Sequence, residues 1–315
     1  MDFSQYYVAY FDVLGYKEAF KKSDDVSAKL VKSIEDSINL MKQIVSAVNA
    51  PYDDSIDEKP EIEYRFFSDN ILVCYKEAKH PYSAFFLASY LRLIATIQRI
   101  FFEGFQLIVR GGVTKGPLYL TRDFVGGKAL IDAVELEENA VYPRIVVDDC
   151  ILNELNPEMQ IDFLKNIMIA FSQDLLVKHI DDKFFLNYII SYAPWIWFPK
   201  NTSHPEKIDS FEEFLKNYRE GCLRKPVYDS KYLKEVLVIL KKHKEFVEKN
   251  INIFSQSSND ATKEASRLKI LKKYLWLASF HNKICENPLY KMPELKINLK
   301  SEFNEQTLAF DVSVG

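Results

Sequence analysis

Glycine is scarce in this chain: it accounts for 9 of the 315 residues, well under the roughly 7% of an average protein. Five of the nine fall between positions 111 and 127, and only Gly221 and Gly315 follow them. Glycine is the residue that allows positive φ and close approach of backbones. The stretch from 111 to 127 is therefore where we expect turns or close contacts that side chains would obstruct.

Other absences exclude whole classes of protein. The four cysteines are widely spaced and form no Cys-x-x-Cys pair, which argues against a disulfide framework and a thiolate zinc site. No run of about 18 apolar residues predicts a membrane span. The first residues, Met-Asp-Phe-Ser-Gln, lack the basic and apolar regions of a signal peptide. We therefore expect a cytoplasmic protein with no membrane partner.

The charge balance is slightly acidic, with 41 Lys and Arg against 45 Asp and Glu and a net charge of -4. This composition has no electrostatic footprint for nucleic acid, so no nucleic-acid partner is expected. A small anion could still bind a local positive cluster. A binder of single-stranded RNA, suggested by one Arg-Gly-Gly at 110–112 and by the aromatic residues, is the weakest alternative because it lacks a basic face.

The first half of the chain alternates strand and helix patterns. Helical periodicity of apolar residues covers 26–48 and 81–102, and strand patterns cover 6–11, 61–67, 71–75 and 105–110. The order is βαββαβ, which is the ferredoxin-like arrangement of an antiparallel sheet with both helices on one face. The predicted fold class is therefore α+β.

The character of the sequence changes near residue 150. We expect one domain over residues 1–150 and a mainly helical extension over 151–315, packed on that domain or forming a dimer. Helical periods cover 230–250 and 262–284. The aromatic segments 184–188 and 195–198 fit either strands or core segments.

Two aspartates stand where strands end or turn. Asp12 follows the first strand pattern, and Asp69 lies in the Ser-Asp-Asn turn of the predicted hairpin. In βαββαβ order these strands are neighbours, so the two carboxylates would converge. Such a pair suits Mg²⁺, which commonly bridges a few carboxylates to substrate phosphates. The alternative is that each aspartate simply forms a turn.

The glycine-rich stretch contains two motif-like segments. Gly111 and Gly112 interrupt a strong strand pattern, either as a β-bulge or corner or to allow a ligand or strand to approach closely. The segment 126–129 resembles a phosphate loop but fails that motif, because Arg122 and Ala129 replace its Gly and its Ser or Thr. Dinucleotide, zincin and nucleophile-elbow motifs are absent from the sequence.

The order of these segments resembles class III nucleotide cyclases, and more closely the bacterial pyrimidine cyclases of Pycsar anti-phage defence. The likeness extends from about residue 6 to 148 and is carried by 9–15, 66–70, 109–112 with Gly116, and 127–129 leading to 135–137. No single motif is decisive. The resemblance implies a ferredoxin-like cyclase homology domain.

The resemblance also implies a mechanism and a site. Two ions, Mg²⁺ or Mn²⁺, would be held by Asp12 and Asp69 while the ribose 3′-hydroxyl attacks the α-phosphorus and pyrophosphate leaves. Backbone amides of Phe11, Val13, Leu14 and Gly15 would face the phosphates. Cations to test are Lys115, Lys128 and Arg144, of which Arg144 is the catalytic candidate. The family implies a homodimer with sites at the interface.

Base selection in this family depends partly on the position four before the second aspartate, which is Arg65 here. Arginine offers only hydrogen-bond donors, which suit uracil, cytosine or guanine acceptors. The likeness to pyrimidine cyclases favours UTP over CTP as the nucleoside triphosphate. The alternative for Arg65 is an ion pair with Glu61 or Glu63.

One departure concerns the helix that ends in Leu136-Glu137. Adenylate and guanylate cyclases carry Asn and Arg where this chain has Ile131 and Glu135. The leading hypothesis is a uridylate cyclase that makes 3′,5′-cyclic UMP as a second messenger in anti-phage defence, with another cation such as Arg144 substituting. The alternatives are a cytidylate cyclase that makes cyclic CMP and a catalytically silent nucleotide-binding protein.

Overall fold

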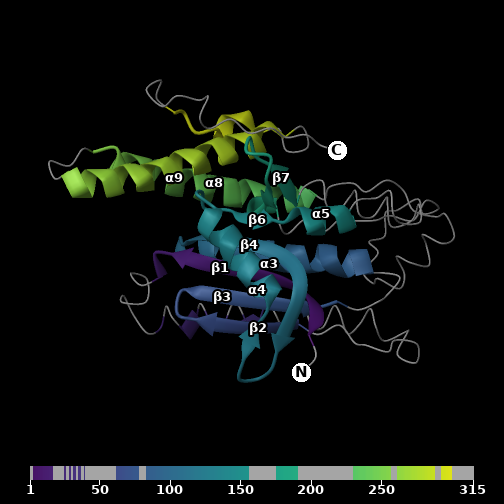
Figure 1. Cartoon of the computed structure of the whole chain (residues 1–315). Coiled ribbons are helices and arrows are strands. Elements are labelled where there is room, and N and C mark those ends of the chain that lie inside the picture. The colour runs from purple at the N-terminus through teal and green to yellow at the C-terminus, as the bar shows by residue number, and fades with distance from the viewer. Residues whose placement is uncertain are drawn as a thin grey trace, which may run out of the picture.

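The computed structural model describes residues 3–16, 62–77, 83–155, 175–190, 230–256, 261–287 and 292–299, with single positions between 25 and 39 (Figure 1). Its strands are β1 (Ser4–Leu14), β2 (Ile62–Phe67), β3 (Asn70–Lys76), β4 (Ile108–Leu120), β5 (Val125–Gly126), β6 (Ile145–Val147), β7 (Leu176–Lys178) and β8 (Phe184–Leu186). Its helices are α3 (Ser83–Phe105), α4 (Lys128–Asn139), α5 (Asp149–Leu155), α8 (Ser230–Phe254) and α9 (Ala261–Glu286), with 3-10 turns η3 (Tyr188–Ile190) and η4 (Pro293–Leu295).

The strands form a single sheet in the order β2-β3-β1-β4-β6-β8-β7, with β5 paired to β4. β1 is antiparallel to both β3 and β4, and β2 is antiparallel to β3. The order of the first four strands is that of a ferredoxin-like sheet, which confirms the predicted α+β class. β6 then adds parallel to β4, and β8 and β7 extend the same edge.

Two strand ends differ from the sequence prediction. β1 continues through Asp12 to Leu14, which pairs with Ile108, and so extends three residues beyond the strand pattern over 6–11. β4 does not stop at its paired glycines, because Gly111 and Gly112 pair with Phe11 and Tyr10 of β1. Most of the helix predicted for 26–48 lies outside the described residues.

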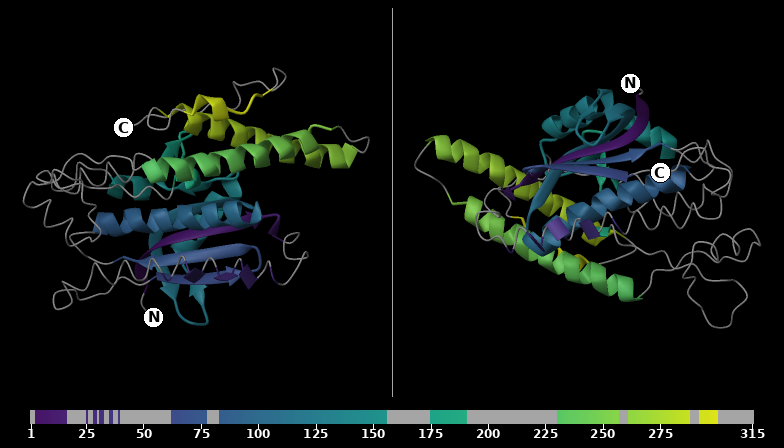
Figure 2. Two further views of the ribbon diagram at one scale, coloured as in Figure 1. Left: turned by 180° about the vertical axis from the view of Figure 1, so that it is seen from behind. Right: turned by 90° about the horizontal axis from the view of Figure 1, so that it is seen from below.

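Alternation along β1 divides the core between the two faces of the sheet. Tyr7, Ala9, Phe11 and Val13 are buried in the cluster that contains α3, whereas even-numbered residues such as Val8 face α4. Successive side chains of a strand point to opposite faces, and Figure 2 shows α3 and α4 on opposite sides of the sheet. Both faces of the central strands are therefore covered.

The second half of the chain adds strands as well as helices. Both predicted long helices are present, as α8 and α9. The segment 184–188, which the sequence left undecided between a strand and a core segment, forms β8 and the start of η3. The segment 195–198 lies outside the described residues. The α8–α9 cluster includes Phe102 of α3 and Ile108 of β4, so the extension packs on the first half. The division at 150 stays a prediction, and α5 runs across it.

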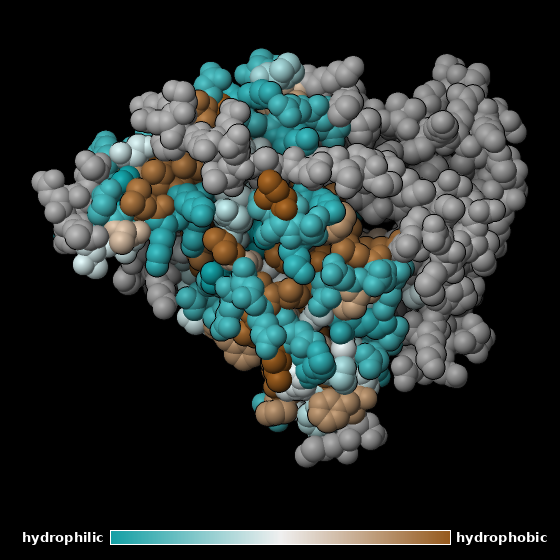
Figure 3. All heavy atoms as spheres, turned by 45° about the horizontal axis from the view of Figure 1, so that its top comes forward, coloured by the Kyte–Doolittle hydropathy of each residue, from teal (hydrophilic) through white to brown (hydrophobic). Residues whose placement is uncertain are grey.

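The surface of the extension is mixed in character. Figure 3 shows hydrophilic side chains over much of one side of the molecule, with smaller hydrophobic groups between them. On α8 and α9, the side chains of Val238, Ile253 and Leu268 are about half exposed. Within the described ranges, no helix combines the length and the apolar character that crossing a membrane requires.

The glycines of β4 set the distance between the sheet and its covering helix. A Cβ on Gly112 would overlap Leu136 Cβ of α4 and lie 2.9 Å from the Ala133 carbonyl oxygen. A Cβ on Gly111 would collide with Phe11 and Tyr10 of β1. The paired glycines therefore allow α4 and β1 of the same chain to lie close to β4. This close packing explains the two glycines without a ligand.

We expect Gly112→Ala to lower the free energy of unfolding by about 1–3 kcal/mol, the usual cost of overpacking. The matched control is Gly104→Ala, because an added Cβ on Gly104 meets no atom within 4 Å in α3. Alanine replacing glycine inside a helix stabilises by roughly 0.5–1 kcal/mol. Urea denaturation of both variants measures the difference; equal effects would contradict the close packing of α4.

A chain of hydrogen bonds runs through the core of the extension. The Leu295 carbonyl can only accept, so His281 donates to it from Nε2 at 2.9 Å. His281 Nδ1 then accepts from His243 Nδ1 at 3.2 Å, and His243 Nε2 accepts from the Tyr188 hydroxyl at 2.7 Å. Both imidazoles are fully buried. Burial lowers the pKa of His243 well below its usual range and that of His281 to about 4.

Stability should therefore fall on acidification. A histidine whose folded pKa is lowered contributes stability that is present above its unfolded pKa, near 6.5, and is lost as pH falls toward 4. For His281 alone this loss is about 2 kcal/mol between pH 7.5 and pH 5. Urea denaturation across this range should show a shallower pH dependence in His281→Gln than in the wild type. An unchanged pH dependence of the free energy of unfolding in this variant would contradict an uncharged His281 in the core.

Candidate functional site

The two aspartates lie side by side at one end of the central strands. Asp69 occupies the two-residue turn between β2 and β3, where Ser68 has a φ of 62°. The Val13 N–H of β1 donates to the Asp69 carbonyl at 2.9 Å. Asp12 pairs with Asn70, which follows Asp69 and is the first residue of β3. Both aspartates are half-buried. The structure thus places the two aspartates that the sequence singled out on neighbouring stretches of backbone.

A second charged pair stands beside them. Arg110 of β4 is opposite Asp12 in the ladder; its Nη2 lies 3.9 Å from Asp12 Oδ2 and forms an ion pair with Glu137 of α4. Glu137 is 6% exposed. Burial raises its pKa, Arg110 acts against that shift, and the charge of Asp12 adds to it. Sequence reasoning quoted both residues within motifs but gave them no role.

Arg65 lies on the same face of the sheet as Asp12. Arg65, Leu72 and Tyr10 form a row across β2, β3 and β1, and Asp12 is two residues beyond Tyr10. Strand spacing and rise place the backbones of Arg65 and Asp12 about 12 Å apart. A nucleotide can span this separation between its base and its phosphates.

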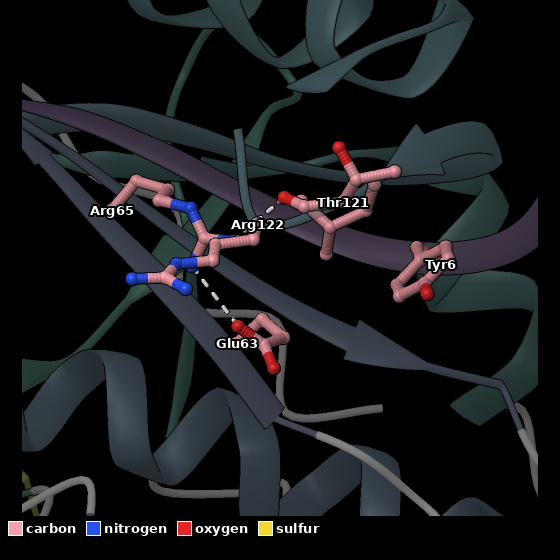
Figure 4. A pocket seen from close by; sticks show the side chains of 6 residues that line it. Tyr6, Glu63, Arg65, Thr121 and Arg122 are labelled. Carbon is pink, nitrogen blue, oxygen red and sulfur yellow. Dashed lines mark hydrogen bonds and ion pairs between the residues drawn. The ribbon is translucent and has the colours of Figure 1, made fainter. Parts of the chain in front are cut away.

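The Arg65 side chain lines a pocket of about 570 Å³ at this edge (Figure 4), together with Tyr6, Glu63, Leu120, Thr121 and Arg122. Its guanidinium donates to Glu63 at 3.0 Å and to the Thr121 carbonyl at 2.9 Å. The ion pair with Glu63 that the sequence left open is therefore present. The pocket still offers donors from two arginines and a carboxylate acceptor.

The other predicted cations are engaged elsewhere. Lys115 pairs with Glu77 at 2.7 Å and with Glu154 at 2.5 Å, and it lies five residues along β4 from Arg110. Lys128 is exposed and pairs with Asp132 one turn later in α4. No contact joins either lysine to Asp12 or Asp69 within the described part of the chain.

Arg144 is held by a partner from the second half. It is 3% exposed and forms two hydrogen bonds with Asp181 in the β7–β8 turn, one of them from Nη1 at 3.1 Å. Burial opposes ionisation of Asp181, but the bonds from Arg144 outweigh it and lower its pKa to about 2. A catalytic role for Arg144 stays a prediction that requires this pair to open.

The segment predicted to face the phosphates is mostly strand. The Val13 amide is taken by Asp69, and the side chains of Phe11 and Val13 are in the core. Leu14 ends β1, and Gly15, with a φ of 84°, is the first residue beyond it. Residues 11–14 are therefore strand, paired with β4 as far as Ile108, and the chain turns at Gly15. Binding of phosphates by the backbone amides of Phe11, Val13, Leu14 and Gly15 stays a prediction.

Ile131 and Glu135, which stand on α4 where adenylate and guanylate cyclases carry Asn and Arg, face outward. Ile131 is 59% exposed and Glu135 is exposed, whereas Ala129, Ala133 and Glu137 form the buried face. Ile131 and Glu135 therefore lie on the side of α4 away from the sheet.

The carboxylate pair fits a hard divalent cation in its chemistry. Mg²⁺ and Mn²⁺ take oxygen ligands and are often bound through one or two carboxylates plus substrate phosphates. Asp12 and Asp69 could supply those carboxylates, and a bound ion would neutralise phosphate charge and favour ionisation of a hydroxyl. Among the described residues, no group of three or more His, Cys, Asp and Glu side chains forms a complete metal site.

The comparisons with known proteins are sparse. No protein family matches the sequence, and no curated protein matches it. Twenty-eight chains of solved structures match the fold. One is the adenylyl cyclase CyaB from P. aeruginosa, with 11% identity and a TM-score of 0.36 over 59% of this chain and 95% of that one.

We expect Asp181→Asn to lower the free energy of unfolding by about 1–3 kcal/mol, because it leaves the buried Arg144 without its charged partner. Arg144→Gln should cost a similar amount, and the double variant should cost less than the sum. Urea denaturation of the four proteins gives the coupling energy. Additive effects would show that Asp181 does not hold Arg144.

Proposed function

We propose that this protein is a metal-dependent nucleotide cyclase that converts UTP to 3′,5′-cyclic UMP and pyrophosphate. The observation that supports this most directly is the adjacency of Asp12 and Asp69, joined through the Val13–Asp69 hydrogen bond. Two neighbouring carboxylates at the end of a sheet suit an ion bridging to a triphosphate. Arg110 beside Asp12 adds a cation to the same place.

In the proposed reaction the ribose 3′-oxygen attacks the α-phosphorus, and the bond from that phosphorus to the pyrophosphate oxygen breaks. The proton of the 3′-hydroxyl leaves to solvent. Phosphoryl transfer of this kind depends mainly on positioning and on neutralising charge. Asp12 and Asp69 would position the triphosphate through the bound ions, and Arg110 would keep the Asp12 carboxylate oriented.

The pocket around Arg65 is the proposed base site. It lies on the same face of the sheet as Asp12, and it combines arginine donors with the Glu63 carboxylate. The edge of uracil presents an acceptor at O4 and a donor at N3, which suit that combination. Cytosine presents a donor and an acceptor as well, so CTP is the competing substrate. The choice of UTP rests on the resemblance to pyrimidine cyclases.

The same resemblance supports further parts of the proposal. The protein would act as a homodimer with its sites at the interface, and cyclic UMP would serve as a second messenger in defence against phage. A cytoplasmic location is proposed from the sequence pattern alone. Ions supplied as Mg²⁺ or Mn²⁺ would be required. Each part is separable from the chemistry at Asp12 and Asp69.

The competing function is a catalytically silent nucleotide-binding protein. It is favoured by Ile131 and Glu135, which stand on α4 in place of the family's Asn and Arg and offer neither a ribose amide nor a cation. In that case the protein would bind a triphosphate without turnover.

The purified full chain, incubated with ATP, GTP, CTP and UTP together and Mn²⁺, should yield cyclic UMP as the main product by mass spectrometry. Asp12→Asn and Asp69→Asn should each reduce the rate by a factor on the order of 10²–10³, because several kcal/mol of charge stabilisation are removed.

The matched control is Asp182→Asn. Asp182 is 86% exposed and has a φ of 61°, which asparagine adopts readily, so its rate should equal that of the wild type. Absence of any cyclic nucleotide from the folded wild type would reject the cyclase. Nucleotide binding without product would identify the silent alternative, and cyclic CMP as the main product would replace UTP by CTP.

A further inference from the structure

Helix α9 packs against the loop that follows α4. The Trp276 ring stacks on Tyr142, with ring centroids 5.4 Å apart and planes 12° apart. Trp276 is fully buried, and its indole N–H donates to His179 at 3.2 Å. Tyr142 lies three residues beyond Asn139, where α4 ends. This contact fixes α9 beside the end of α4 that carries Glu137.

Lys273 lies three residues before Trp276, about one helical turn, so both project to the same side of α9. Lys273 is half-buried, whereas its neighbour Lys272 is exposed. The charges that act on Lys273 come from Arg110, Asp12 and Glu137, which belong to β4, β1 and α4. The extension therefore places a lysine within the electrostatic range of the candidate site.

The two cations of this group, Arg110 and Lys273, differ in whether a nearby carboxylate forms an ion pair with them. Arg110 is ion-paired with Glu137 and lies near Asp12. Lys273 makes no ion pair within 4.0 Å to another described residue. Burial and then Arg110 lower its pKa, while Asp12 and Glu137 act in the opposite direction. A half-buried ammonium group that forms no ion pair with a carboxylate of the described residues is suited to an arriving anion.

We propose that Lys273 is a substrate-binding residue of the Asp12–Asp69 site and binds the triphosphate of the nucleotide. This inference rests on the proposed function. It assigns to the helical extension a direct part in the site, through a flexible side chain that ends in a compact charge. It also supplies, from outside the first half, the positive charge that Ile131 and Glu135 do not provide.

The test compares Lys273→Met, Lys273→Gln and Lys273→Arg with Lys272→Met, the matched control on the exposed side of the same helix. Two measurements are made on the full chain with Mn²⁺: steady-state kinetics with UTP and calorimetric binding of inorganic tripolyphosphate. The neutral variants should raise KM and weaken tripolyphosphate binding by about tenfold or more, as expected when a charged hydrogen bond is lost. Lys273→Arg should restore most of the affinity, and Lys272→Met should match the wild type.

Neutral variants that bind tripolyphosphate as well as Lys272→Met would overturn the inference, whether or not the wild type is active. An Arg variant as weak as the Met variant would overturn it as well, since charge would not be the property required. A wild type that makes no cyclic product but binds tripolyphosphate through Lys273 would reject the proposed function and support the inference. Normal cyclase activity in every Lys273 variant would reject the inference alone.

Discussion

The close approach of α4 to β4 is the constraint on which the site depends. Gly112 has no side chain where Leu136 packs, so the helix lies directly on the sheet. That contact places Glu137, one residue further along α4, against Arg110, two residues earlier on β4. Arg110 in turn reaches Asp12 of β1. A larger residue at 112 would push α4 outward and separate the charges that surround Asp12.

The charges at this end of the sheet belong to elements that are far apart in the sequence. Asp12, Asp69, Arg110 and Glu137 come from β1, the β2–β3 turn, β4 and α4, and Lys273 comes from α9. Burial raises the pKa of Glu137, and the guanidinium of Arg110 acts against that shift. Neighbouring acidic and basic groups from five elements therefore shape the electrostatic field at this end of the sheet.

Much of the fold was predictable because it is written in local patterns. The hairpin carrying Asp69, the α3 helix and the two long helices follow from period-2 and period-3.6 repeats of apolar residues. The ends of β1 and β4 were not predictable in this way, because Leu14 and Gly112 are held in strand by pairing with residues about a hundred positions away. The addition of β7 and β8 to the sheet likewise depends on pairing with β6.

The same distinction applies to the site. Asp12 and Asp69 could be identified because one follows an apolar strand pattern and the other lies in a hairpin turn, and neighbouring strands bring such positions together. Arg144 could not be placed, because its partner Asp181 is in a turn of the second half. Lys115 and Lys128 were candidates by charge alone, and both meet carboxylates that no local pattern reveals. Sequence reasoning assigned Lys273 no role in the site, because the stacking of Trp276 on Tyr142, which brings α9 close to α4, joins residues more than a hundred positions apart.

The pairing of β1 with β4 has a consequence for synthesis of the chain. Val8 of β1 pairs with Thr114 of β4, so the first strand emerges from the ribosome long before its partner exists. At roughly 5–20 residues per second, the wait is on the order of 5–20 s. Throughout that time an aromatic, apolar strand has an unpaired edge, which is the type of segment that aggregates. Newly made chains should therefore depend on chaperones until the fourth strand of the sheet has been translated.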